Sequence, residues 1–213
     1  MARQRAFDRE VALERALLTF WRHGYEATSV AELTAAMGIR PPSLYAAFGD
    51  KRRLFEEAVR RYQETYGAFT SRALAEEPTG RAAVERVLRE SAAEYASDSH
   101  PAGCLIITAA VNCGPESAEV QGLLREFREA AKAALKERID GDVAAGRLPA
   151  DTDTAGLATF YAAVIQGMST QSRDGASHAA LLHIAELAMS AWPASRSGSQ
   201  GLDRGVLRGD LGA

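Results

Sequence analysis

The stretch TSVAELTAAMGIRPPSLYAAFGDK, residues 28–51, predicts two short helices joined by a tight turn and followed at once by a third helix. Ser29 stands three residues before Glu32, which is the capping-box spacing. Gly38 supplies the left-handed residue that ends such a helix. Pro41 and Pro42 lack amide protons, so they suit the first turn of the next helix, where those donors have no intrahelical partner. The stretch therefore predicts a helix-turn-helix over about 29–48, the motif whose second helix enters the DNA major groove.

Composition favours a globular protein of the reducing cytoplasm. Hydrophobic residues make up 46% of the 213 residues and charged residues 25%. No apolar run approaches the roughly 18–20 residues that span a bilayer. The basic N-terminus has no apolar core after it, so we expect no signal peptide. Two cysteines in a chain of this length argue against a disulfide scaffold.

Charge is unevenly divided along the chain, whose net charge is −3. Residues 1–60 hold ten Lys or Arg and eight Asp or Glu, a net +2, and the remaining residues hold fifteen and twenty, a net −5. A slightly basic N-terminal part on an acidic body fits a DNA-reading head attached to a body that does not touch phosphates.

The 3.6-residue period in nearly every segment predicts an all-α fold of about nine helices. Asp8 is a candidate cap for the first helix, which closes near Gly24, and Asp50 is the cap of a fourth helix that runs to about Ala75. Further helices are expected from about Gly103 to Asn112 and over 117–145, 155–172 and 177–192. We divide the chain into a DNA-binding domain at 6–66, an effector-binding and dimerisation domain at 67–193, and a flexible tail at 194–213.

The two C-terminal helices, 155–172 and 177–192, are rich in Ala, Gly and aliphatic residues and poor in charge. A helix that is apolar around most of its circumference must be covered on more than one side. A partner subunit is the most economical cover in a chain of this size, which predicts a homodimer held by an intersubunit four-helix bundle. The expected interface residues are Leu157, Val164, Met168, Leu181, Ile184, Leu187 and Ala188.

Residues 23–55, HGYEATSVAELTAAMGIRPPSLYAAFGDKRRLF, resemble the DNA-binding domain of the TetR (tetracycline-repressor-like) family of bacterial transcription regulators. The landmarks are a Gly-Tyr pair, a Thr-Ser cap, a short helix, Gly-Ile, a second helix with Leu-Tyr-x-x-Phe, and Asp-Lys opening the next helix. The resemblance covers about the first 66 residues. The pieces PAGCLI (101–106) and QSRDGASHAALLHIAELA (171–188) resemble segments of the ligand-binding domains of such regulators.

The resemblance implies roles for eight residues on DNA. Tyr45 and Lys51 would contact phosphates, and Thr28 and Ser29 would offer donors to another phosphate. The positions that would face base edges are Arg40, Pro41, Pro42 and Ser43. Arg40 is the candidate for direct readout, because a guanidinium can pair bidentately with guanine. Family members often have a small capping residue at this position and Lys-Gly or a similar pair at the two proline positions, so the target sequence is expected to differ.

The resemblance also implies an effector pocket among the middle helices, with Asn112 and Gln166 as polar anchors in a largely apolar lining. Aromatic residues at helical spacing would equally serve as ordinary core. The candidate lining residues are Tyr62, Tyr66, Phe69, Tyr95, Cys104, Ile107, Asn112, Phe127, Phe160, Tyr161 and Gln166.

Other chemistries find no support in the residue spacing. Cys104 and Cys113 are nine residues apart, which on one helix points them about 180° apart. The four histidines lack metal-ligand spacing, and no nucleophile–base–orienter set can be assembled. We therefore expect no metal, no cofactor and no enzymatic activity.

The sequence favours a cytoplasmic, dimeric, ligand-responsive regulator that binds a palindromic DNA operator and is released by a small, largely apolar effector. Activation in place of repression stays open. The alternatives are an effector-independent architectural DNA-binding protein and a helical enzyme.

Overall fold

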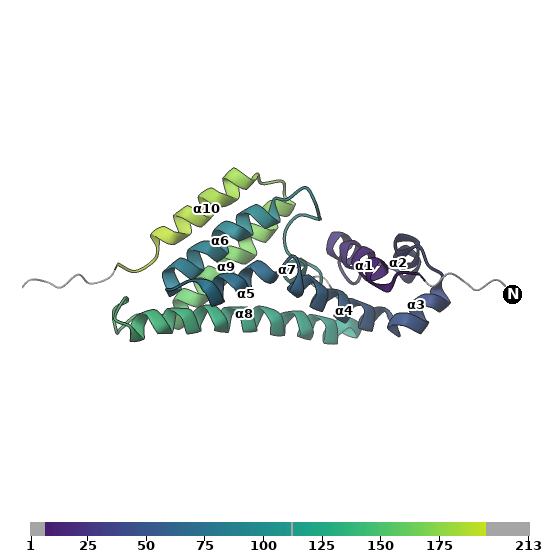
Figure 1. Cartoon of the computed structure of the whole chain (residues 1–213), viewed down its shortest axis with the longest axis horizontal. Helices are drawn as coiled ribbons and strands as arrows, with labels where there is room; N and C mark the ends of the chain where they lie inside the picture. Colours follow the sequence, from purple (N-terminus) through teal and green to yellow (C-terminus); the bar gives the residue numbers. More distant parts are fainter. Residues whose placement is uncertain (1–6, 112, 195–213) are drawn as a thin grey trace, which may run out of the picture.

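A computed structural model describes residues 7–111 and 113–194, and within them the regular structure consists of helices joined by turns and loops, without a β-strand. The all-α prediction is confirmed. Three helices form a head at one end of an elongated molecule, and a fourth leads from the head into a helical body (Figure 1). The head and its connecting helix are α1 (Arg9–His23), α2 (Val30–Met37), α3 (Pro41–Phe48) and α4 (Lys51–Glu64). The body comprises α5 (Ala68–Glu76), α6 (Gly80–Tyr95), α7 (Leu105–Thr108), the 3-10 helix η1 (Pro115–Ser117), α8 (Ala118–Ala144), α9 (Thr154–Arg173) and α10 (His178–Ser190).

The helix ends of the head lie where local sequence predicts them. The Asp8 side chain accepts hydrogen bonds from the first-turn amides of α1. Ser29 and Glu32 form the full capping box, in which each side chain accepts from the other residue's backbone N–H. Gly38 ends α2 with a φ of 70°, and Asp50 accepts from the amide of α4's third residue. These short-range hydrogen bonds satisfy amides that a helix leaves unpaired, so they fix the boundaries independently of tertiary packing.

The core of the head consists of large apolar side chains from all four of its helices. Phe20, Leu33, Leu44 and Phe55 are fully buried, and Phe48 is nearly so. Burying side chains of this size stabilises the fold by about 1.5–3 kcal/mol each. Leu44 and Phe48 anchor the inner face of α3, which leaves its opposite face free to contact a ligand.

The predicted fourth helix, Asp50 to about Ala75, is corrected by the structure. It ends at Glu64, turns through residues 65–67 and restarts as α5. The amide of Gly67 donates to the Tyr62 carbonyl over 2.8 Å. A Cβ at Gly67 would lie only 2.8 Å from the side-chain oxygen of Gln63. The glycine therefore permits a close turn that apolar periodicity cannot reveal, because both flanking segments carry apolar faces.

The helix expected from about Gly103 to Asn112 is also shorter than predicted. The structure has α7 only over Leu105–Thr108, and Asn112 lies outside the described residues. Gly103 precedes α7 with a φ of 77°. After α7, the Ala109 carbonyl accepts a hydrogen bond from the Tyr25 amide over 2.7 Å. The Ala109 carbonyl is therefore paired with the head and not with an amide of a longer α7.

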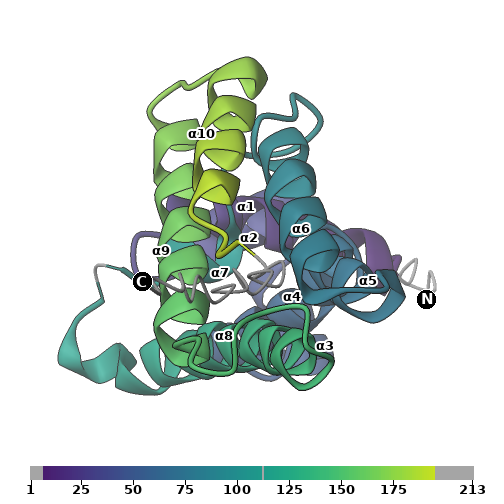
Figure 2. The same ribbon diagram turned by 90° about the vertical axis from the view of Figure 1, so that its left-hand side faces the viewer.

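The body is organised around α6 and α8. Viewed end-on, α8 underlies the body, with α5 and α6 above it on one side and α9 and α10 on the other (Figure 2). Helix α6 packs against α5, α8, α9 and α10. The buried carboxylate of Asp142, from α8, accepts hydrogen bonds from the amides of Gly80 and Arg81 at the start of α6, both over 3.0 Å. Among the described residues, no helix is long and apolar enough to cross a membrane.

Candidate functional site

The outward face of α3 carries the residues predicted to face base edges. Arg40, Pro41 and Pro42 are exposed at its N-terminus, and Ser43 is half-buried. The two prolines occupy the first two helical positions, and the Arg40 side chain makes no capping hydrogen bond. Tyr45 is 51% exposed. The four residues from Arg40 to Ser43 therefore lie together at the start of a short helix whose inner face is packed in the core.

Lys51 opens α4 close to this surface. Its ammonium lies 4.4 Å from the centroid of the Tyr25 ring, a cation–π arrangement that restricts where the charge can point. Partial burial lowers the pKa of Lys51. The N-terminus of α4 adds a partial positive charge beside it, so the position suits an anion.

Thr28 and Ser29 differ from the prediction and from each other. The Thr28 side chain is fully buried, and its hydroxyl donates to the Gly24 carbonyl over 2.6 Å. It therefore offers no donor to a phosphate, and the prediction for its hydroxyl is wrong. Ser29 is exposed, but its hydroxyl takes part in the capping box with Glu32.

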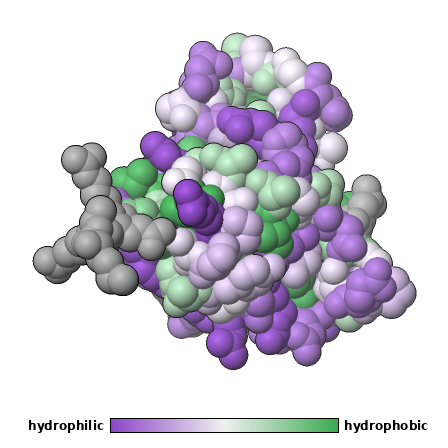
Figure 3. Space-filling model, turned by 90° about the vertical axis from the view of Figure 1, so that its right-hand side faces the viewer, coloured by the Kyte–Doolittle hydropathy of each residue, from purple (hydrophilic) through white to green (hydrophobic). Residues whose placement is uncertain are grey.

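Figure 3 views this end of the molecule, where hydrophilic residues cover much of the surface between small hydrophobic areas.

A cavity of about 330 Å³ lies in the body between α4–α5, α7, α8 and α9. That volume is at the lower end of the range for small-molecule sites. Seven of the predicted pocket residues line it, namely Tyr62, Phe69, Tyr95, Cys104, Ile107, Phe127 and Gln166. Three others do not line it. Tyr66 lies at the α4–α5 turn in a separate depression, Phe160 is 41% exposed on the outside of α9, and buried Tyr161 donates to the Ala188 carbonyl.

The inner end of the cavity holds neutral polar groups. The Tyr62 hydroxyl donates to the Cys104 sulfur over 3.2 Å, and the Cys104 amide donates to Ser169 Oγ over 2.9 Å. Burial raises the pKa of the Cys104 thiol, and burial likewise raises those of Tyr62 and Tyr95 well above their usual value. The thiol is therefore protonated near neutral pH and is a poor nucleophile.

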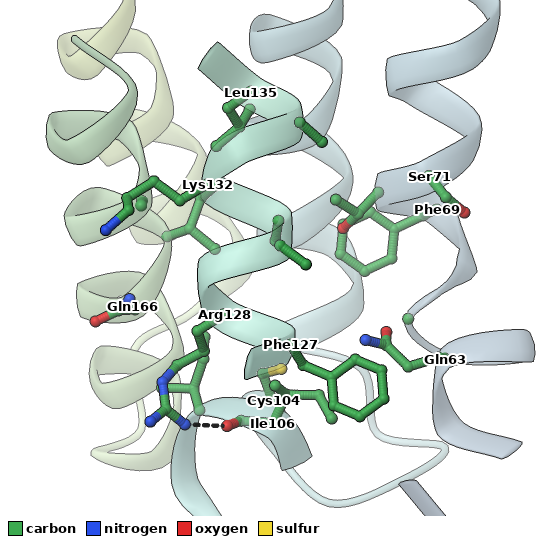
Figure 4. A pocket seen from close by; sticks show the side chains of 18 of the residues that line it. Gln63, Phe69, Ser71, Cys104, Ile106, Phe127, Arg128, Lys132, Leu135 and Gln166 are labelled. Carbon is green, nitrogen blue, oxygen red and sulfur yellow. Dashed lines mark hydrogen bonds between the residues drawn. The ribbon is translucent and has the colours of Figure 1, made fainter. Parts of the chain in front are cut away.

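Several polar residues that line the cavity were not predicted from the sequence. Arg128 and Lys132 from α8 and Gln63 from α4 line the cavity. Figure 4 shows the Arg128 guanidinium donating to the Ile106 carbonyl, a contact of 2.9 Å. Charged residues on an amphipathic helix ordinarily face solvent, so helical period alone gave no reason to place these inside.

The comparisons with known proteins agree with this two-part arrangement. The family model "Bacterial regulatory proteins, tetR family" matches residues 12–58, which span the head. The model "Tetracyclin repressor-like, C-terminal domain" matches residues 80–186, half of the chain. The chain belongs to the TetR family. It is a helix-turn-helix transcriptional repressor of that family, which consists of regulators and not of enzymes.

Relatives match nearly the whole chain. The HTH-type transcriptional repressor ComR of Escherichia coli (strain K12) is 34% identical over 90% of this chain and 91% of its own length. The repressor BdcR of the same strain is 32% identical over 81% of this chain and 83% of its own. A solved structure of a cysteine mutant of the TetR family regulator CifR, complexed with 26-base-pair operator DNA, is 45% identical, covers 90% of this chain and 100% of that chain, and has a TM-score of 0.86.

The predicted dimer face of this TetR-family chain is partly corrected. Met168, Leu181 and Ala188 are buried within the monomer, where they belong to its own core, so they leave little or no surface for a partner. Leu187 is 58% exposed. The remaining predicted residues Leu157, Val164 and Ile184 are half-buried at the edge of the core.

The head and the body of this TetR-family chain are joined by polar contacts that the sequence did not indicate. Ser117 Oγ donates to Glu26 Oε2 over 2.6 Å, and the guanidinium of Arg52 lies 2.5 Å from Glu119 Oε2. Glu26 follows Tyr25, whose ring lies against Lys51, and Arg52 follows Lys51 itself. Both contacts therefore connect the start of α8 to the surroundings of Lys51. The body therefore borders the candidate phosphate site directly.

Proposed function

We propose that this chain is a homodimeric repressor that binds a palindromic operator and is released when a small molecule occupies the cavity of the body. The observation that carries the proposal is the exposed outer face of α3, in a chain 45% identical over 90% of its length to a regulator crystallised on double-stranded operator DNA. Such a repressor acts in the bacterial cytoplasm, where the DNA is. The domain division at about residue 66 fits the proposal, because it separates a DNA-binding head from an effector-binding body.

In this proposal, α3 lies in the major groove. Arg40 reads a base edge, because its guanidinium is exposed and makes no capping hydrogen bond. Tyr45 and Lys51 contact phosphates and so fix the position of α3 along the DNA. Phosphate contacts carry no sequence information themselves. Pro41, Pro42 and Ser43 border the bases as well. The amide end of α2, next to Ser29, is a weaker candidate for a phosphate contact.

Dimerisation through α9 and α10 would relate two heads by a two-fold axis. Two recognition helices that read one face of DNA lie about 34–36 Å apart, one helical turn, so the operator would be an inverted repeat. The exposed Leu187 and Phe160 support this face as the interface. Their burial in a partner would remove apolar surface from water.

The cavity supports an effector-controlled repressor over an architectural DNA-binding protein, which would need no space among its middle helices. Tyr62 lines the cavity and belongs to α4, the helix that Lys51 opens. A ligand that binds one orientation of α4 better than another shifts the population toward that orientation. Because both heads must keep their spacing to bind DNA, a small change in the orientation of α4 lowers the affinity for the operator.

Selection from a random pool of double-stranded DNA tests the proposal. We expect enrichment of an inverted repeat with half-site centres one helical turn apart, bound by two copies of the chain. Sedimentation of the selected complex measures the stoichiometry. Recovery of DNA without a repeated half-site, or binding by a single copy, would contradict the dimeric operator model.

A further inference from the structure

The two sides of the cavity differ in polarity. Figure 4 shows the polar ends of Arg128, Lys132 and Gln166 gathered on one side, and the rings of Phe69 and Phe127 on the other, together with the uncharged side chains of Gln63 and Ser71. The first two project from α8, and Gln166 projects from the facing helix α9. A ligand that fills this space meets aromatic carbon at one end and cationic nitrogen at the other.

The charges around the cavity are of one sign. Its lining includes two cations and no Asp or Glu, in a chain whose net charge is −3. A second, more open groove shares Ile107, Arg128 and Gln166 with the cavity. That groove adds a third cation, Arg125, and again no carboxylate. The two hollows therefore meet at a positively charged boundary.

Arg128 lies at this boundary and makes no ion pair within the part of the chain that the structure describes. Its guanidinium is half-buried, and one of its donors is used by the Ile106 carbonyl. Among residues 7–111 and 113–194, no carboxylate lies within ion-pair distance of Arg128 or of Arg125. By contrast, the Lys132 ammonium lies 2.6 Å from Glu129 Oε2. Since a guanidinium carries five N–H donors, most of those on Arg128 remain available to a bound anion.

A neutral ligand would be poorly accommodated beside this group. By filling the cavity it would remove water from a guanidinium that has no carboxylate partner, and an unpaired charge is costly to desolvate. A carboxylate would replace the lost water with a charge-assisted, bidentate pair. The burial that already lowers the pKa of Arg128 shows that its environment is partly desolvated.

We propose that the effector is an amphipathic anion, whose apolar part packs beside Phe69 and Phe127 and whose carboxylate is bound by Arg128. Arg125, one turn earlier on α8, adds a second positive charge at the groove. This inference rests on the proposed effector role of the cavity and specifies the chemistry of the ligand. Lys132 contributes less because it is already paired.

Calorimetric titration of the full chain with octanoate and with 1-octanol tests the proposal, since the two probes share a chain length and differ in charge. We expect octanoate to bind at least about tenfold more tightly than 1-octanol, as a charge-assisted hydrogen bond at a desolvated site allows. Arg128→Gln should remove most of that preference. Lys136→Gln is the matched control on the same helix, because Lys136 lines neither hollow and its ammonium lies 2.7 Å from Asp140 Oδ2; it should change octanoate affinity by less than about threefold.

Two measurements separate the anion contact from a loss of fold. Arg128→Gln should keep its helical circular dichroism and its affinity for 1-octanol. If that variant does not fold, exposed Arg125→Gln should still lower octanoate affinity, and added salt should weaken octanoate binding to the unaltered chain without weakening 1-octanol binding.

Equal binding of the two probes, no binding of octanoate, or an octanoate affinity that Arg128→Gln and Arg125→Gln leave unchanged would each overturn the inference. Its failure is distinguishable from that of the proposed function. Release of operator DNA by 1-octanol but not by octanoate would leave an effector-controlled repressor with a neutral ligand. Tight octanoate binding without any effect on DNA would instead contradict the proposed function.

Discussion

The hydroxyl of Tyr66 donates a hydrogen bond to Glu14 Oε1 over 2.7 Å and so ties the turn between α4 and α5 to the middle of α1. Glu14 also accepts from the Arg61 guanidinium over 2.6 Å. Burial, followed by the hydrogen bond to Glu14, raises the pKa of Tyr66 to about 12, so the phenol remains a donor across the physiological range. The next residue, Gly67, lines the cavity. Through the neighbouring Gly67, this contact connects the lining of the cavity to the head.

Tyr66→Phe should loosen this connection while leaving the fold intact. Loss of a hydrogen bond worth about 1 kcal/mol should accelerate amide hydrogen exchange in the turn at residues 65–68 by roughly fivefold. Tyr45→Phe is the control, because Tyr45 is exposed on α3 and remote from the turn. It should weaken DNA binding without altering exchange in the turn. Unchanged exchange in the Tyr66 variant would show that the contact does not restrain the turn.

Arg40→Ala and Lys51→Ala should affect DNA binding in different ways. Removal of a base-reading guanidinium should cost about 1–3 kcal/mol at the operator and relax sequence preference at one position. Removal of a phosphate contact should weaken operator and random DNA alike and reduce the salt dependence of binding by about one counterion. Titration of both DNAs at several salt concentrations separates the two effects. If both variants lost the same affinity for operator and for random DNA, Arg40 would not be a base reader.

Leu187→Glu should convert a dimer into monomers. The side chain is 58% exposed in the monomer, so a carboxylate there is hydrated in the single chain but would be buried against a partner. Sedimentation velocity measures the change, and helical circular dichroism should stay the same. Ala133→Glu, which places the same charge on an exposed face of α8, is the control and should remain dimeric. A dimeric Leu187→Glu protein would place the interface elsewhere.

Asp142 should make stability depend on acid pH. Burial acts to raise the pKa of this carboxyl, but hydrogen bonds from the Gly80 amide and Arg147 outweigh it and leave the pKa lowered in the folded state. The stabilisation is therefore complete above the unfolded-state value of about 4 and is lost as pH falls through the lower folded-state value. Asp142→Asn should cost about 1–3 kcal/mol at pH 7, and the difference should shrink toward pH 3. Denaturant unfolding at several pH values measures it, and exposed Asp98→Asn should show no such difference.

Local signals account for the parts of the fold that were predicted correctly. The caps at Asp8, Ser29 and Asp50 and the left-handed Gly38 act over three or four residues, so their effect is contained in the adjacent sequence. The break at residues 65–67 was missed because the segments on both sides of it carry apolar faces, and the break after α7 was missed because the chain there contacts a distant segment. At that second break the Ala109 carbonyl accepts a hydrogen bond from Tyr25, more than eighty residues earlier in the chain.

The sequence by itself determined the helical head and its helix-turn-helix, because these depend on short-range capping and on one apolar face per helix. The DNA-facing residues follow from the family resemblance and stay a prediction. Only the tertiary structure decided which polar residues enter the cavity and which apolar residues remain outside the core. Arg128 lies at the cavity because α7 and α9 pack beside α8. Leu187 stays exposed while Leu181 is buried because α10 packs against α6 and α9 and leaves its outer face uncovered. Periodicity identifies the faces of a helix, but the neighbouring helices decide what each face meets.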